Sequence, residues 1–125
     1  MRFIRQCVII VFGIYLHIFN KIEVIGKENI PKKGAYVLCS NHVHWIDPIV
    51  YVASTWRMIY VIGKEELCST KLKSWVMRGL GVIPVNREKP GSNGGSLMEA
   101  INKLKNGHLL LIYPEGTRFG LKKRY

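Results

Sequence analysis

Residues 57–85 read RMIYVIGKEELCSTKLKSWVMRGLGVIPV and contain two apolar runs separated by a basic segment. The first part, Arg57–Gly63, is an apolar run that predicts a buried strand, and Val82–Val85 predicts a second one. Between them the basic segment Lys71–Leu80 predicts a short helix that closes at Gly79 and Gly81. A strand, a helix and another strand in this order form the unit from which parallel sheets are built.

The same alternation continues on both sides of this unit. Ala35–Ser40 and His108–Tyr113 are apolar runs that we expect to be buried strands, and Lys21–Gly34 alternates in a way that favours a strand with turns. Asp47-Pro48 predicts a helix that Asp47 caps, and the capping box Ser96-x-x-Glu99 predicts another. The sequence therefore predicts an α/β domain with a largely parallel or mixed sheet flanked by helices.

Length and composition allow one packed domain. The chain has 125 residues, of which 48% are hydrophobic and 22% charged, which excludes disordered and collagen-like classes. Lysine and arginine number 19 against 8 acidic residues, and the net charge of +11 implies an anionic partner. Cysteines 7, 39 and 68 form neither a disulfide framework nor a zinc motif, which favours a reducing compartment, with Cys39 as a small core residue.

The N-terminus combines basic and apolar residues. Arg2 and Arg5 precede an apolar run, Cys7–Phe19, that is shorter than the roughly 20 residues needed to span a bilayer. A signal peptide would need a small-residue cleavage site, which Leu16–Val24 lacks, while length alone equally allows a buried core helix. The favoured interpretation is an uncleaved helix in one leaflet, with Arg2, Arg5 and Lys21 at headgroup depth and the remaining chain on the cytoplasmic side.

Side chains with catalytic potential follow the predicted strands, where ligands of such sheets bind. In the first of these segments His42 and Asp47 form an H-x-x-x-x-D pair. A carboxylate that orients a histidine and stabilises its imidazolium makes a general base. No G-x-S-x-G nucleophile accompanies the pair, so this base would act on a substrate hydroxyl. The alternative is that Asp47 only caps a helix and His42 only hydrogen-bonds the backbone.

A metal site is the competing interpretation of this segment. His42-x-His44 with Asp47 superficially matches a metallohydrolase cluster, H-x-H-x-D-H. Ile46 and Asp47 stand where that cluster has Asp and His, and His108 is isolated, so we expect no metal.

Two further segments offer donors to an anion. Arg87, at the end of a predicted strand, is suited to bind a phosphate with two hydrogen bonds, although solvated arginines are common in basic proteins. In the segment after the last strand, Gly116 permits a tight turn, and Thr117 and Arg118 supply donors. Glu115 is a candidate to hold an arginine in place.

Taken in order, these motifs resemble those of a known family. NHVHWIDP (41–48), KEEL (64–67), GVIPVNR (81–87) and YPEGTR (113–118) resemble the lysophosphatidic acid (1-acyl-sn-glycerol-3-phosphate) acyltransferases of the glycerolipid acyltransferase superfamily. The resemblance covers the chain from about Ile22 to its end. It implies an acyltransferase domain over residues 22–125 with a glycerol-3-phosphate acyltransferase-like fold, after a membrane-associating helix over residues 1–21.

The resemblance also implies a mechanism. His42 would deprotonate the free hydroxyl of lysophosphatidic acid, and Asp47 would orient His42. The acyl donor would be a thioester of coenzyme A or acyl carrier protein, the product phosphatidic acid, and no cofactor would be needed. The implied substrate-binding residues are Arg87, Glu115, Gly116, Thr117 and Arg118.

Three positions depart from the family pattern. His44 stands where relatives often carry serine, and Asn86 where they often carry aspartate. The chain ends at Tyr125, whereas family members continue with further strands and a fourth motif, which predicts a truncated chain. Two alternatives stay open: acylation of a different lysolipid, and a truncated, non-catalytic membrane-binding remnant. Nucleic acid is not an expected partner, because the basic residues are scattered and no nucleic-acid-binding signature is present.

Overall fold

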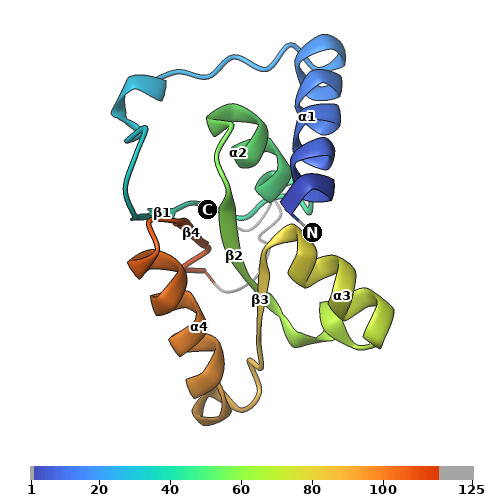
Figure 1. Ribbon diagram of the computed structural model, residues 1–125, viewed down its shortest axis with the longest axis vertical. Coiled ribbons are helices and arrows are strands. Elements are labelled where there is room, and N and C mark those ends of the chain that lie inside the picture. The colour runs from blue at the N-terminus through green and yellow to red at the C-terminus, as the bar shows by residue number, and fades with distance from the viewer. Residues whose placement is uncertain (1, 116–125) are drawn as a thin grey trace, which may run out of the picture.

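The fold is built on a single sheet of four parallel strands in the order β1-β4-β2-β3. We describe residues 2–115 of a computed structural model, shown in Figure 1. The elements in chain order are α1 (Arg2–Phe19), the 3-10 turn η1 (Lys27–Asn29), β1 (Tyr36–Cys39), α2 (Asp47–Thr55), β2 (Ile59–Lys64), η2 (Glu65–Cys68), α3 (Lys71–Leu80), β3 (Val82–Val85), η3 (Pro90–Ser92), α4 (Gly94–Lys105) and β4 (Leu109–Ile112). The predicted α/β class with a parallel sheet flanked by helices is confirmed.

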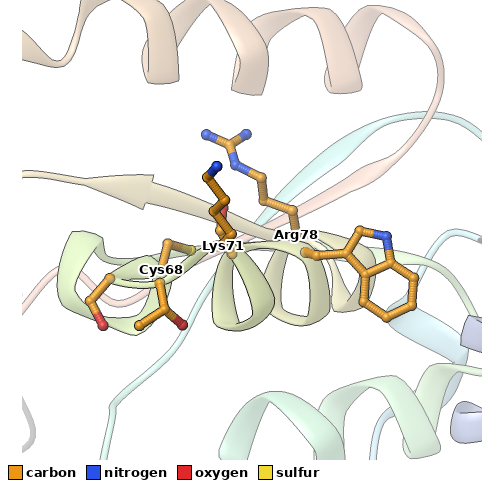
Figure 2. A pocket seen from close by; sticks show the side chains of 7 residues that line it. Cys68, Lys71 and Arg78 are labelled. Carbon is orange, nitrogen blue, oxygen red and sulfur yellow. The ribbon is translucent and has the colours of Figure 1, made fainter.

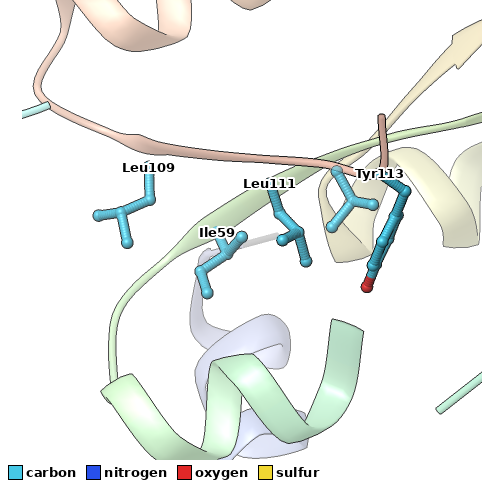
Figure 3. Close-up of a cluster of buried hydrophobic side chains, with 5 residues drawn as sticks. Ile59, Leu109, Leu111 and Tyr113 are labelled. Atoms are coloured by element: carbon cyan, nitrogen blue, oxygen red, sulfur yellow. The ribbon is translucent and has the colours of Figure 1, made fainter. Parts of the chain in front are cut away.

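Helices cover both faces of the sheet. On one face, inward side chains of β2 and β4 pack against Tyr51 and Val52 of α2, and Figure 3 shows Ile59, Leu109 and Leu111 in this cluster. On the opposite face α4 contributes Ala100 and Leu104, which pack with Ile83, Leu110 and Ile112. The three central side chains of the first cluster, Ile59, Leu109 and Leu111, are fully buried, so the two middle strands form the core of the domain.

Three predictions about the strands and about α4 are wrong. Lys21–Gly34 forms no strand, because its alternating residues have no neighbouring strand with which to pair. The strand β1 lies at an edge and is half-exposed rather than buried, so Cys39 is exposed and is not a core residue. The capping box does not form, since α4 already begins at Gly94 and the Ser96 hydroxyl donates to the carbonyl of Pro84 instead.

The N-terminal helix α1 packs against α2 and reaches the sheet. Leu16 is buried, and the ring of Trp56 lies so close to Gly13 that a Cβ at this position would contact it at 3.1 Å. Arg5 is buried too: its Nη2 donates to the carbonyl oxygen of Ile59 at 2.7 Å, and its guanidinium lies over the ring of Tyr60. Burial lowers the pKa of the Arg5 guanidinium, and the neighbouring Tyr60 opposes this shift.

The placement of Arg5 at headgroup depth is therefore wrong. A basic residue ahead of an apolar run occurs in membrane anchors. It occurs equally in helices that bury one arginine against their own domain, so the pattern does not distinguish the two. The hydrogen bond to the carbonyl and the contact with the aromatic ring offset the free energy that the guanidinium loses when it is removed from water. Within residues 2–115, none of the helices combines the length and the hydropathy that a bilayer span needs.

We expect Arg5→Ala to lower the free energy of unfolding by about 2–3 kcal/mol, because it removes a hydrogen bond from a charged donor and a cation–π contact. Gln6→Ala, one residue further on an exposed side of α1, is the matched control and should change stability by less than about 0.5 kcal/mol. Urea unfolding followed by circular dichroism measures both. Equal, small effects would show that Arg5 is not an anchor of α1.

Candidate active site

The candidate site lies at the carboxyl edge of the sheet, in the loops that follow β1 and β4. These two strands are neighbours, and their pairing ends where the backbone N–H of Ser40 donates to the carbonyl of Ile112 at 3.1 Å. His42 follows Ser40 by two residues and Glu115 follows Ile112 by three. The parallel register thus brings together two segments that are 73 residues apart in sequence.

His42 and Asp47 are in direct contact. The Nδ1 atom of His42 lies 3.1 Å from Oδ2 of Asp47, and the two side chains are only 17% and 21% exposed. An ionised carboxylate only accepts hydrogen bonds, so the proton of neutral His42 lies on Nδ1 and the lone pair on Nε2. The pair has the geometry of a general base with its orienting carboxylate.

Asp47 does not cap α2 as predicted. It is the first residue of the helix, Ile46 holds the cap position, and the carboxylate turns back toward the preceding loop. There Oδ2 also accepts from the backbone N–H of Val43 at 2.8 Å and of His44 at 2.9 Å. Burial alone would raise the pKa of Asp47, but these two N–H groups and His42 together lower it. Asp47 is therefore ionised at neutral pH.

Glu115 supports the same loop from the turn that follows β4. Its Oε2 accepts from the backbone N–H of His42 at 3.1 Å. The sequence suggested that Glu115 would hold an arginine, and its contact with the loop of the base was not foreseen. Gly116, Thr117 and Arg118 lie outside the described residues.

Tyr113 forms a platform beneath His42 that sequence analysis missed. The two rings are stacked with centroids 4.1 Å apart and planes inclined by 25°. Figure 3 shows Tyr113 at the end of β4, and only 9% of the residue is exposed. Burial raises the pKa of the Tyr113 phenol, with Asp47 and Tyr51 adding to the effect, so the ring stays neutral. The sequence does contain one signal for this role, because Tyr113 directly follows an apolar strand and therefore lies at the carboxyl edge of the sheet.

The ring of His44 takes no part in this cluster. His44 is exposed, and its Nδ1 accepts from the backbone N–H of Ile46 at 3.4 Å. Only its backbone N–H reaches Asp47, whereas His42 approaches Asp47 through its ring. Among residues 2–115 no group of three or more His, Cys, Asp or Glu side chains is arranged to hold a metal ion.

Arg87 lies at the same edge of the sheet but away from His42. It follows β3, and β3 is three strands from β1, so the two loops start roughly 14 Å apart at about 4.8 Å per strand. Arg87 is exposed, and within the described part of the chain its side chain has no hydrogen-bond or ion-pair partner. The structure therefore unites His42, Asp47 and Glu115 but leaves Arg87 apart.

Asn86 shapes the loop that carries Arg87. Its Oδ1 accepts from the backbone N–H groups of Glu88 and Lys89, at 3.0 and 2.9 Å. Its Nδ2 donates to Oε2 of Glu65, the residue after β2, at 2.8 Å. An amide can serve as donor and acceptor at once, which an ionised aspartate cannot.

Comparison with known proteins identifies the family of the chain. A protein-family model described as Acyltransferase matches residues 21–124, which include every segment of the candidate site. The chain belongs to the Acyltransferase family. Family membership extends over the sheet, α2, α3 and α4, and leaves only α1 outside the match.

Several curated relatives within the family are similar over most of this chain. A 1-acyl-sn-glycerol-3-phosphate acyltransferase of Borreliella burgdorferi is 34% identical over 98 residues, which is 78% of this chain and 39% of the relative. One from Bacillus subtilis is 31% identical over 106 residues, 84% of this chain and 52% of the relative. The chain thus spans about half or less of the length of these relatives. No solved structure matches the chain significantly.

The Asp47 cluster makes stability depend on pH. A carboxyl whose pKa is lowered by folding stabilises the protein above its ordinary value of 3.8, and this stabilisation is lost as the pH falls through the folded-state value. We expect Asp47→Asn to cost about 1.5–3 kcal/mol at pH 7, and the difference from the parent to shrink below pH 3.8. Urea unfolding at both pH values tests this, with the exposed Glu23→Gln as control. A difference that does not vary with pH would contradict the assigned hydrogen bonds.

The Asn86–Glu65 contact predicts a coupled pair of substitutions. Asn86→Asp should destabilise the protein by about 1 kcal/mol, because it places a carboxylate against that of Glu65 and removes the donor. Adding Glu65→Gln to the Asn86→Asp variant should recover most of this loss, since the glutamine amide can donate to the new carboxylate. A double-mutant cycle measured by urea unfolding gives the coupling energy, and additive effects would contradict the contact.

Proposed function

We propose that the protein transfers a fatty acyl group from a thioester to the free hydroxyl of 1-acyl-sn-glycerol-3-phosphate, giving phosphatidic acid. The observation that carries the proposal is the contact of His42 Nδ1 with Asp47 Oδ2, in a loop that Glu115 of the neighbouring strand holds. Relatives that bear this name match the chain over most of its length, which supports the choice of acceptor.

The geometry suggests the order of steps. The lone pair of His42 Nε2 takes the proton of the acceptor hydroxyl while that oxygen attacks the thioester carbonyl carbon. Asp47 stabilises the imidazolium that forms. When the tetrahedral intermediate collapses, the carbon–sulfur bond breaks and the departing thiolate takes the proton from His42. Coenzyme A or acyl carrier protein would carry the thioester, and the chain's own residues supply the base.

The acceptor needs a separate binding site for its phosphate. Arg87 is exposed at the same carboxyl edge of the sheet as His42, which suits a phosphate contact with two hydrogen bonds. We propose that Arg87 shares this role with Gly116, Thr117 and Arg118. Held at its phosphate, the acceptor would present its hydroxyl to His42 at high effective concentration.

A second candidate is acylation of a different lysolipid. The Lyso-ornithine lipid O-acyltransferase of Rhodobacter capsulatus is 25% identical over 88 residues, which is 70% of this chain and 30% of the relative. The histidine–aspartate pair fixes the chemistry of the base and leaves the acceptor headgroup open.

We further propose that the protein works on the cytoplasmic face of a membrane, where its lipid acceptor resides. The outer side of α1 supports this, because it is apolar along the whole helix and open to solvent, with Phe3, Ile10, Ile14 and Ile18 all about half or more exposed. An apolar helix face of this kind lies in the interface of a bilayer without crossing it.

His42→Ala should lower the rate of acyl transfer by at least a hundredfold, because general bases contribute about 10²–10⁴-fold. His44→Ser should keep most of the activity, since the His44 ring contacts neither Asp47 nor Glu115 among the described residues. The assay supplies labelled acyl-CoA or labelled acyl-acyl carrier protein as the donor, with 1-acylglycerol-3-phosphate or lyso-ornithine lipid in vesicles as the acceptor, and it uses the full chain.

The same assay separates the alternative functions. A parent protein that is inactive on both acceptors would favour the non-catalytic remnant, and activity on lyso-ornithine lipid alone would identify the other lysolipid class. A dead His44→Ser with an active His42→Ala would overturn the mechanism.

A further inference from the structure

The helix α3 turns its apolar side away from the protein. Leu72, Trp75 and Val76 are 71%, 55% and 37% exposed and lie on one face at the spacing i, i+3, i+4. Ser74 and Met77, on the opposite side of α3, are half-buried. A helix packed into a core has the reverse arrangement, so within residues 2–115 the apolar face of α3 is left largely exposed.

Cations border this face on both sides. In helical projection Lys71 and Arg78 lie along one side of the apolar face and Lys73 lies along the other, and α3 contains no acidic residue. Arg78 Nη1 is paired with Glu99 of α4 at 3.1 Å, whereas Lys71 and Lys73 have no carboxylate partner within residues 2–115. Figure 2 shows Lys71 and Arg78 extending from the same side of α3, where they line a shallow hollow of about 560 Å³ together with Trp75.

We propose that the outer face of α3 is a docking surface for a bilayer that contains anionic lipids. An apolar ridge with tryptophan, flanked by lysines and roughly 15 Å long, is the arrangement of a helix that lies in a membrane interface. Leu72, Trp75 and Val76 enter the acyl boundary, and the hollow beside Lys71 receives lipid phosphates. A second copy of the chain fits this surface poorly, because the lysines of one copy would face those of the other.

The end of α3 packs against the start of α1. Gly81, which ends α3 with a φ of 96°, lies so close to the guanidinium of Arg5 that a side chain at this position would overlap it. The start of α1 is thereby fixed against the end of α3. Docking by α3 goes beyond the proposed function and needs no catalysis, so vesicle binding and acyl transfer can fail independently.

Trp75 is itself the probe for this contact. The double variant Trp45→Phe/Trp56→Phe leaves Trp75 as the only tryptophan. Vesicles of phosphatidylcholine with phosphatidylglycerol should shift its emission to shorter wavelength, and brominated lipid should quench it. Vesicles of phosphatidylcholine alone should bind at least tenfold more weakly, since the lysines then have no anionic partner. Unchanged Trp75 emission while the protein co-sediments with vesicles would overturn the proposal and leave α1 as the contact.

Matched variants separate α3 from the rest of the surface. Leu72→Ser should weaken vesicle binding about tenfold, whereas Leu97→Ser, at a leucine of α4 that is also well exposed, should change it less than twofold. Lys73→Glu should likewise weaken binding about tenfold, and the exposed Lys105→Glu on α4 should have little effect. Circular dichroism confirms that each variant is folded. Equal effects within either pair, or a dimer in sedimentation velocity that Leu72→Ser abolishes, would show that this face does not dock on a bilayer.

Discussion

The pairing of β1 with β4 is the constraint on which the candidate site depends. Its last hydrogen bond, from the Ser40 N–H to the Ile112 carbonyl, fixes the point at which the loops after both strands begin. Because the strands are parallel, the loops leave in the same direction, and Glu115 meets the backbone of His42. A shift of one residue in this register would turn the side chain of Tyr113 to the other face of the sheet and remove the ring beneath His42.

Asp47 shows how a loop can recruit a residue that the sequence assigns to a helix cap. A capping aspartate would accept from the backbone N–H of the second or third residue of the helix that follows it. Instead its carboxylate accepts from Val43, His44 and His42, three donors that precede it. The carboxylate thereby satisfies N–H donors of the loop after β1, which have no partner strand to bond to. The same contacts keep the carboxylate charged and hold the imidazole in one orientation, so the structure of the loop and the chemistry of the pair have a common cause.

Features set by local sequence were predictable, and those set by distant contacts were not. The bounds of α3 and β3 follow from hydrophobic pattern and from Gly81, which supplies the positive φ that ends the helix. The contact of His42 with Asp47 was likewise expected from the motif. Ser96 formed no capping box because it lies inside a helix that starts earlier and faces the carbonyl of Pro84, a partner on another element. The stacking of Tyr113 on His42 required the order of the strands, which propensities and periodicity do not contain.

Arg5 fixes the orientation of α1 relative to the rest of the domain. A helix that only floats in a leaflet could rotate relative to the domain that follows it. Here the guanidinium bonded to the Ile59 carbonyl, together with buried Leu16, fixes the inner side of α1 against the domain. Ile59 lies in β2, which pairs with β4, and β4 leads to Tyr113 and Glu115. A surface that bound the outer side of α1 would therefore hold the carboxyl edge of the sheet, and with it His42, at a fixed orientation toward that surface.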